Sequence, residues 1–136
     1  MIRPINHDTF LLSQKSVPAT KADMSVVTDL TDTLRANLDR CVGMAANMIG
    51  INKRIIAVAM GPMVIPMINP IIIRKSEPYE AVEGCLSLCG ERKTTRYQTI
   101  EVEYQDISFK SHRQTYTGFI AQIIQHEVDH CDGILI

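Results

Sequence analysis

The sequence predicts an α+β fold, in which antiparallel or mixed β-sheets pack around a C-terminal helix and an N-terminal helix lies outside. Apolar residues recur at helical spacing in residues 20–38 and again from residue 117 onward. Between these segments the chain has short apolar runs, one alternating stretch and several glycines and prolines, a pattern typical of strands and turns. A block of strands with a helix at each end favours the α+β class over repeated strand and helix units.

The N-terminal part is expected to contain a short helix and a longer one. Residues 7–12 favour the short helix, which the break before Pro18 ends. Thr20 is the predicted N-cap of the longer helix, and Asp23 three residues later is a short form of the capping box. The helix is expected to do only packing work, through an aliphatic stripe formed by Val26, Val27, Leu30, Leu34 and Leu38.

Three segments follow in the middle of the chain. Residues 41–50 are rich in small side chains and predict a strand edge or loop that a ligand or backbone can approach closely. Residues 54–60 predict a buried strand. The apolar run at residues 68–73 lies next to Pro66 and contains Pro70, so edge strands are expected there, where a missing N–H is tolerated.

The last third of the chain contains the remaining elements. Residues 84–90 begin and end with glycine and predict a loop. Residues 100–105 alternate between apolar and polar side chains, which predicts a half-exposed antiparallel strand, and a turn at 106–111 leads to a partner strand at 114–117. The final helix is expected to turn an apolar stripe to the sheets, formed by Phe119, Ile120, Ile123 and Ile124.

Composition narrows the classes of partner. The chain has 136 residues, 46% hydrophobic and 21% charged, which fits one ordinary domain without disulfides. A net charge of -1 argues against direct binding to nucleic acid or to an anionic membrane. Neutral small molecules and peptides remain possible binding partners. No apolar leader or bilayer-length run is present, so a cytoplasmic protein is expected. The cytosol is reducing, so free thiols or metal ligands, and not disulfides, are expected at Cys41, Cys85, Cys89 and Cys131.

The strongest motif is H-E-x-x-H in the final helix. His126 and His130 are four residues apart, so their imidazoles lie on one helix face and can bind one metal ion. Glu127 stands beside the pair, where a general base for a metal-activated water is needed. The final helix is therefore predicted to be metal-binding. The alternative is a packing helix in which the two histidines have this spacing by chance.

Two histidines need at least one more ligand, and Cys85 in the glycine-flanked segment is the best candidate. Three protein ligands and one open position are typical of a catalytic metal site. The backbone N–H of Leu86 is then well placed to stabilise a developing oxyanion. An alternative adds Cys89 as a fourth ligand, which gives a closed structural zinc site. A zinc endopeptidase is a further alternative, suggested by H-E-x-x-H alone.

Three boxes resemble those of the peptide deformylases. Residues 83–87 (EGCLS), residues 125–130 (QHEVDH) and residues 42–46 (VGMAA) are similar to the family's three motifs in order and spacing. The similarity covers essentially the whole chain and implies a single deformylase-like domain over residues 1–136. It implies an enzyme that hydrolyses the N-formyl group from the initiator methionine of new bacterial polypeptides, so N-formylmethionyl peptides or nascent chains are the expected partners.

The resemblance also assigns roles to residues. It implies an Fe(II) ion, replaceable by nickel, cobalt or zinc, with Cys85, His126 and His130 as ligands. The general base maps onto Glu127 and the backbone oxyanion donor onto Leu86. The pocket for the methionine side chain is expected to involve Val42, Gly43, Met48, Phe119 and Ile123.

One departure from the family pattern concerns the oxyanion. The first box of the family ends in a glutamine that donates a hydrogen bond, and here Met48 has no N–H to donate. Loss of one such donor lowers the rate about a hundredfold to a thousandfold. In an extended segment Asn47 would point the other way and could not replace it. An alternative function is therefore a deformylase-like protein that binds metal and peptide N termini with weak or no turnover.

Overall fold

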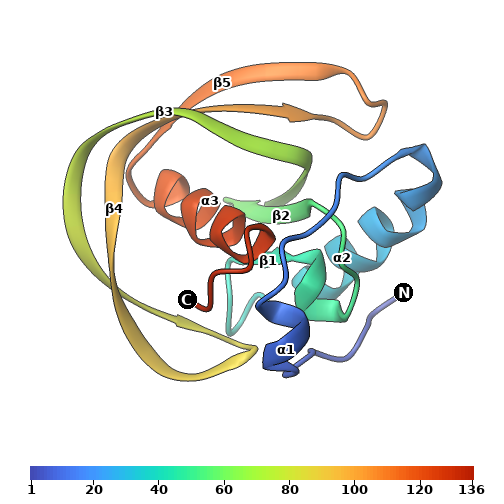
Figure 1. Cartoon of the computed structure of the whole chain (residues 1–136). Helices are drawn as coiled ribbons and strands as arrows, with labels where there is room; N and C mark the ends of the chain where they lie inside the picture. Colours follow the sequence, from blue (N-terminus) through green and yellow to red (C-terminus); the bar gives the residue numbers. More distant parts are fainter.

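The computed structural model describes residues 1–136, with five strands and five helical segments (Figure 1). The helical segments are α1 (Thr9–Leu12), the 3-10 helix η1 (Lys21–Asp23), α2 (Met24–Ala36), the 3-10 helix η2 (Ala46–Ile49) and α3 (Gly118–Cys131). The strands are β1 (Gly43–Ala45), β2 (Ile55–Met60), β3 (Met63–Cys85), β4 (Leu88–Gln105) and β5 (Ser111–Thr117). The predicted α+β class is confirmed.

All five strands belong to one antiparallel sheet in the order β1-β2-β3-β4-β5, so the expectation of several or mixed sheets was too broad. The only parallel pairing is an isolated bridge between Val17 and Lys53. Strands β3 and β4 form a long hairpin that curves around α3, as Figure 1 shows. This curvature brings the tip of the hairpin back to the helix.

The pieces predicted at residues 68–73 are part of one strand, β3, which runs without a break for 23 residues. Their predicted edge character is confirmed, because Ile71 and Ile72 pair with β4 alone. The first part of β3 pairs with β2, and the rest pairs with β4. Pro66 lies opposite Ala57 of β2 in the part where β3 has no second neighbour. Pro70 lies in an irregularity between Ile68 and Ile71. Pro66 thus lies where β3 has one free edge and Pro70 lies in an irregularity of the ladder, and proline is tolerated at both kinds of position.

The predicted loop at residues 84–90 is a tight hairpin instead. Strand β3 continues to Cys85, which pairs with Leu88 of β4 across a two-residue turn. Gly84 pairs with Glu91, so the register shifts between these two pairs. The hairpin holds the backbone around Cys85 in place far more firmly than an open loop would.

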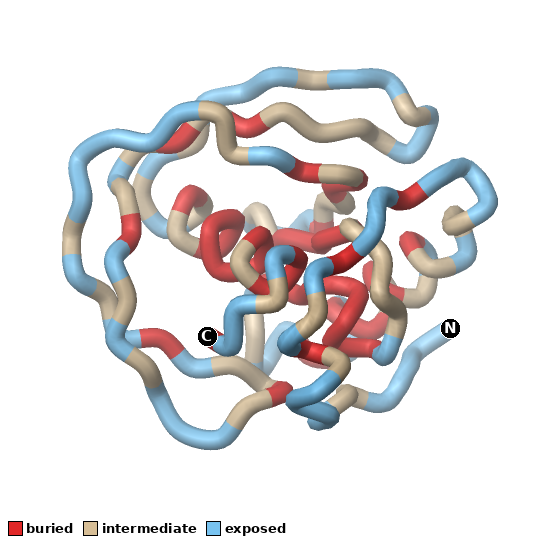
Figure 2. The backbone as a smooth tube through the Cα atoms, in the orientation of Figure 1, coloured by how far each residue is buried: buried red, intermediate tan, exposed pale blue.

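The two longer helices lie on opposite faces of the sheet, because alternate residues of β2 belong to different cores. Ile55 and Ala57 join a core that contains the buried residues of α2, whereas Ile56 and Val58 join a core that contains those of α3. Figure 2 shows α3 largely buried and the curved β3–β4 hairpin largely exposed. Helix α2 ends at Ala36, before the last residue of its predicted stripe. None of the helices has the length and apolar character that a bilayer crossing needs.

Candidate metal centre

Helix α3 presents both histidines of the H-E-x-x-H motif to the interior. Ala121, Ile124 and Val128 anchor the helix in its core, which turns the next face toward the hairpin tip. On that face the Nε2 atoms of His126 and His130 lie 3.2 Å apart, and both side chains are buried. The sequence spacing therefore does bring the two rings together.

Cys85 reaches the same point from the end of β3. Its Sγ lies 3.3 Å from Nε2 of His130, and the donor atoms of Cys85, His126 and His130 all lie within 4.8 Å of one another. Tetrahedral bonds of about 2.0 to 2.3 Å place N and S donors about 3.3 to 3.6 Å apart. One thiol and two imidazoles at this separation fit a single divalent ion.

A buried carboxylate orients the first histidine. Oε1 of Glu83 lies 2.8 Å from Nδ1 of His126, which leaves Nε2 free to face Cys85. The Glu83 carboxylate also accepts hydrogen bonds from Arg96, at 2.7 Å, and from Gln122, at 2.9 Å. Burial alone would raise the pKa of Glu83, but the hydrogen bonds from His126, Arg96 and Gln122 lower it to about 2. Glu83 is therefore an acceptor only.

The charges around the two histidines favour one positive charge in this site. Burial would lower the pKa of His126, but the neighbouring Cys85 sulfur and Glu83 carboxylate raise it to about 10. Burial and the adjacent charge of His126 lower the pKa of His130 to about 3. Nδ1 of His130 is buried without a hydrogen-bond partner. A cation between the donor atoms would satisfy the same electrostatic preference.

Glu127 lies beside the donors in an apolar setting. It is 4% exposed, and its Oε1 has no hydrogen-bond partner. Burial raises the pKa of Glu127 to about 7, so this carboxyl group can both accept and return a proton near neutral pH. Gly43 of β1 permits the close approach, because a Cβ there would lie 2.8 Å from Oε2 of Glu127 and 2.6 Å from Cγ2 of Ile123.

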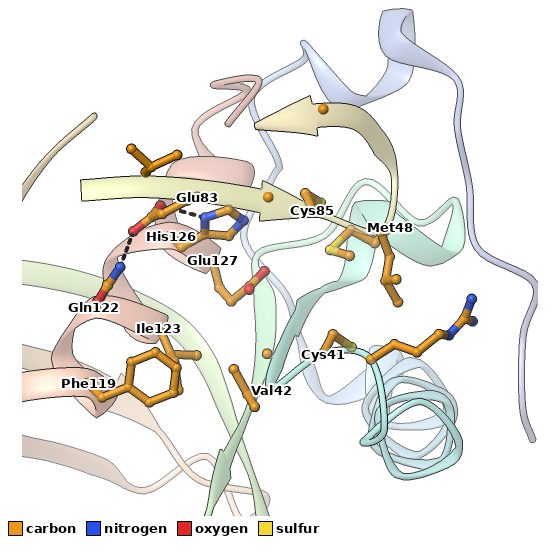
Figure 3. A pocket seen from close by; sticks show the side chains of 16 residues that line it. Cys41, Val42, Met48, Glu83, Cys85, Phe119, Gln122, Ile123, His126 and Glu127 are labelled. Atoms are coloured by element: carbon orange, nitrogen blue, oxygen red, sulfur yellow. Dashed lines mark hydrogen bonds and ion pairs between the residues drawn. The ribbon is translucent and has the colours of Figure 1, made fainter. Parts of the chain in front are cut away.

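A cavity of about 500 Å³ opens beside the site. Its lining includes every residue predicted for the substrate pocket: Val42, Gly43, Met48, Phe119 and Ile123. In Figure 3, Phe119 and Ile123 lie on one side of the cavity, and Met48 with Cys41 lies on the other. Helix α3 and the β1–η2 segment thus face each other across this space.

Five lining side chains belong to no predicted site residue: Arg40, Cys41, Val82, Glu83 and Gln122. Gln122 precedes His126 by one helical turn, so the same spacing that links the histidines could have located it. Val82 could not be located from sequence, because residues just before Cys85 were not predicted to be a strand. The Cys41 thiol is neutral, since burial raises its pKa to about 11.

The segment after β1 differs from the expected extended conformation. Residues 46–49 form the helix η2, and Gly50 ends it with a φ of 84°. The Asn47 amide donates to the carbonyl of His130 at 2.8 Å and does not line the cavity, so it supplies no donor there. Met48 does line the cavity, and its Sδ accepts a hydrogen bond from the Ala45 N–H at 3.5 Å. The backbone N–H of Leu86, in the hairpin turn, donates to no group of the chain.

The remaining cysteines do not complete a closed site. Cys89 is exposed in the hairpin irregularity and is not among the three clustered donors. Cys131 is buried in the α3 core, where burial raises its pKa to about 12. A structural zinc site with four protein ligands therefore lacks its fourth ligand.

Three converging donors beside a buried carboxyl group, at the edge of an open cavity, place the protein among the mononuclear metal-dependent hydrolases. The polypeptide deformylase family model matches residues 1–136, the whole chain. The protein belongs to the peptide deformylase family, whose members are metal-dependent and act on the N-formylated ends of nascent peptides.

Individual relatives agree with this assignment. The chain is 59% identical to a peptide deformylase from Clostridium beijerinckii over 100% of both chains. A class I type b peptide deformylase from Acinetobacter baumannii, with Met-Ala-Ser bound, superposes with a TM-score of 0.86 at 32% identity, covering 99% of this chain and 97% of that one. The peptide deformylase from Thermotoga maritima gives a TM-score of 0.89 at 27% identity, covering 99% and 95%.

Proposed function

We propose that this protein hydrolyses the N-formyl group of N-formylmethionyl peptides at one metal ion held by Cys85, His126 and His130. The observation that carries the proposal is the convergence of these three donor atoms within 4.8 Å beside the buried Glu127. A divalent ion bound there would supply Lewis acidity and lower the pKa of a water molecule to about 7.

Residues of the chain would then transfer the protons and stabilise the negative charge that develops on the substrate. Glu127 accepts a proton from the attacking water and returns it to the leaving amine, which its pKa of about 7 permits. The free N–H of Leu86 donates a hydrogen bond to the oxygen on which negative charge develops. Glu83 holds Nδ1 of His126, so the imidazole keeps its orientation throughout.

The proposed metal is Fe(II), following the family resemblance. Zinc, nickel or cobalt can replace it, because one thiolate with two imidazoles accommodates all of these ions. A ferrous site with a thiolate ligand is sensitive to oxygen, because oxygen can oxidise the cysteine. Anaerobic purification followed by metal analysis would identify the ion.

The proposed site for the methionine side chain is the part of the cavity that contains Val42, Gly43, Met48, Phe119 and Ile123. The Acinetobacter baumannii relative has been solved with Met-Ala-Ser, a peptide that begins with methionine. A peptide of this type reaches the metal donors of the present chain through the open side of the cavity, beside the exposed Phe119 and Val42.

Binding without turnover, the alternative suggested by Met48, is not favoured. Identity of 59% over the full length of a curated peptide deformylase supports an active hydrolase. The direct test is an assay of iron-loaded protein on formyl-Met-Ala-Ser, with Cys85→Ala as the control that removes a ligand. We expect turnover and one bound ion in the parent protein, and neither in the variant. A fully metal-loaded parent protein that binds the peptide and does not hydrolyse it would establish the alternative.

A further inference from the structure

Gln122 is a polar residue in the wall of the cavity that the proposed chemistry does not use. It lies on α3 one turn before His126, between the apolar Phe119 and Ile123 in the lining. In Figure 3 it is beside Glu83, on the same side of the cavity as Phe119 and Ile123. The α3 wall of the methionine site is therefore not purely apolar.

Two hydrogen bonds fix the orientation of the Gln122 amide. Nε2 donates to Oε2 of Glu83 at 2.9 Å, and Oε1 accepts from the Tyr79 hydroxyl at 3.3 Å. A flipped amide would point its oxygen at the Glu83 carboxylate, which can only accept hydrogen bonds while it is ionised. The nitrogen of Gln122 therefore stays on the Glu83 side.

The fixed amide has one unused donor. A carboxamide nitrogen carries two hydrogens, and Nε2 of Gln122 gives only one of them to an acceptor within the chain. Phe119 and Ile123 offer only carbon atoms to the cavity. The second N–H is thus available to a ligand that brings an acceptor to this wall.

The distances suit the sulfur of a methionine side chain. One helical turn separates Gln122 from His126, about 6 Å along the helix axis. The five bonds that join a formyl carbon to the thioether sulfur of formylmethionine span about 6 Å when extended. A formyl carbon near the metal donors therefore places the sulfur at the level of Gln122, where a thioether can act as a weak acceptor.

We propose that Gln122 determines specificity within the proposed function, by donating its second N–H to the thioether sulfur of the substrate and so favouring methionine over norleucine. Norleucine has a methylene group in place of sulfur and nearly the same shape. With norleucine bound, this N–H meets no acceptor on the ligand. A hydrogen bond of ordinary net strength gives a preference of about two- to tenfold.

The first test compares kcat/KM for formyl-Met-Ala-Ser and formyl-norleucine-Ala-Ser with metal-loaded protein. We expect a preference of about two- to tenfold for methionine in the parent chain, and a ratio near one in Gln122→Met and Gln122→Leu. Tyr79→Phe is the matched control, because it removes the other partner of the same amide without changing the cavity lining. It should retain the preference. A parent ratio of one, or variants that keep the preference, would overturn the inference.

The second test measures binding and needs no turnover. Calorimetry with Met-Ala-Ser and norleucine-Ala-Ser on the metal-loaded parent protein should show the same preference, even where a Gln122 variant folds poorly. If formyl peptides are not hydrolysed, but the parent protein binds methionine more tightly than norleucine and Gln122→Leu does not, the proposed function fails and the role of Gln122 stands. If both formyl peptides are hydrolysed and bound equally well, the proposed function stands and the role of Gln122 is wrong.

Discussion

Helices α2 and α3 are nearly equal in length, 13 and 14 residues, and they cover opposite faces of the same sheet. The two helices bury different kinds of side chain. The buried positions of α2 are aliphatic or threonine, whereas α3 buries Gln125, His126, Glu127 and His130. A helix that only packs needs no buried titratable group, so the contrast separates the element that stabilises the fold from the element that carries the site.

The partners of the buried polar groups make the same distinction. Thr31 and Thr33 of α2 donate to carbonyls of their own helix, and Gln125 of α3 is satisfied by Tyr97 and Ala121. Glu127 and His130 each keep a buried atom with no partner, and α2 has no such atom. Unsatisfied polar atoms cost stability, and they are tolerated where a ligand or a reaction uses them.

The largest expected effect is the loss of kcat that follows a substitution in α3. Glu127→Gln keeps the shape of the side chain but removes the proton acceptor, so we expect kcat to fall about a hundredfold to ten-thousandfold. Metal content should remain that of the parent protein, because Glu127 is not among the clustered donors. The measurement is the formyl-Met-Ala-Ser assay alongside metal analysis. An active Glu127→Gln variant would mean that α3 supplies ligands but no base.

The next effect concerns the carboxylate that orients His126. Glu83→Gln leaves Arg96 with only Asp129 as an ionic partner, and breaking a buried pair costs about 3 to 5 kcal/mol. The pKa of Glu83 lies near 2, below its ordinary 4.5, so its stabilising contribution is present above pH 4.5 and is lost as pH falls toward 2.

Denaturant unfolding of the parent protein and of Glu83→Gln across this pH range measures that contribution. The difference between their free energies of unfolding should shrink as the solution becomes more acidic. A difference that stays constant as the pH falls from 4.5 to about 2, the window between the two pKa values, would show that the Glu83 charge does not stabilise the fold.

The third prediction concerns Met48, which belongs to the α2-side core but also lines the cavity. Met48→Gln returns an amide donor to that wall, so we expect kcat to rise by about a hundredfold. Met48→Leu, which adds no donor, is the matched control. Equal rates in both variants would mean that the cavity does not use a donor at this position.

A core substitution in α2 should affect stability alone. Leu30 is fully buried, and Leu30→Ala is expected to lower the free energy of unfolding by about 2 to 5 kcal/mol. The kcat per bound metal ion should stay that of the parent protein at a temperature where the variant is folded. Urea unfolding and the formyl-Met-Ala-Ser assay give the two quantities. A drop in kcat would show that α2 affects the site through the sheet.

The smallest effect is expected at the start of the helical segment that leads into α2. The Thr20 hydroxyl accepts from the Ala22 N–H, and the Asp23 carboxylate accepts from the Thr20 N–H at 2.8 Å. Thr20→Ala removes the first of these bonds and should cost about 1 kcal/mol of stability. The exposed Ser25→Ala is the control, and thermal unfolding should show no loss for it.

The sequence by itself determined the local features of this protein. The capping box of Thr20 and Asp23, the strand at residues 55–60 and the histidine pair of α3 depend on neighbours within a few residues, so periodicity and spacing are sufficient to predict them. The three motif boxes could likewise be identified from the sequence, because their residues and their spacing are properties of the sequence itself.

Only the tertiary structure decided how these parts meet. Pro66 and Pro70 of β3 suggest a broken strand until their neighbours in the sheet are known, and the hydrogen bond between Glu83 and His126 joins residues 43 positions apart. The path of the hairpin around α3 also brings Gln122 against Glu83. Side chains distant in sequence come into contact through strand register and helix packing, and neither is encoded in any single short segment.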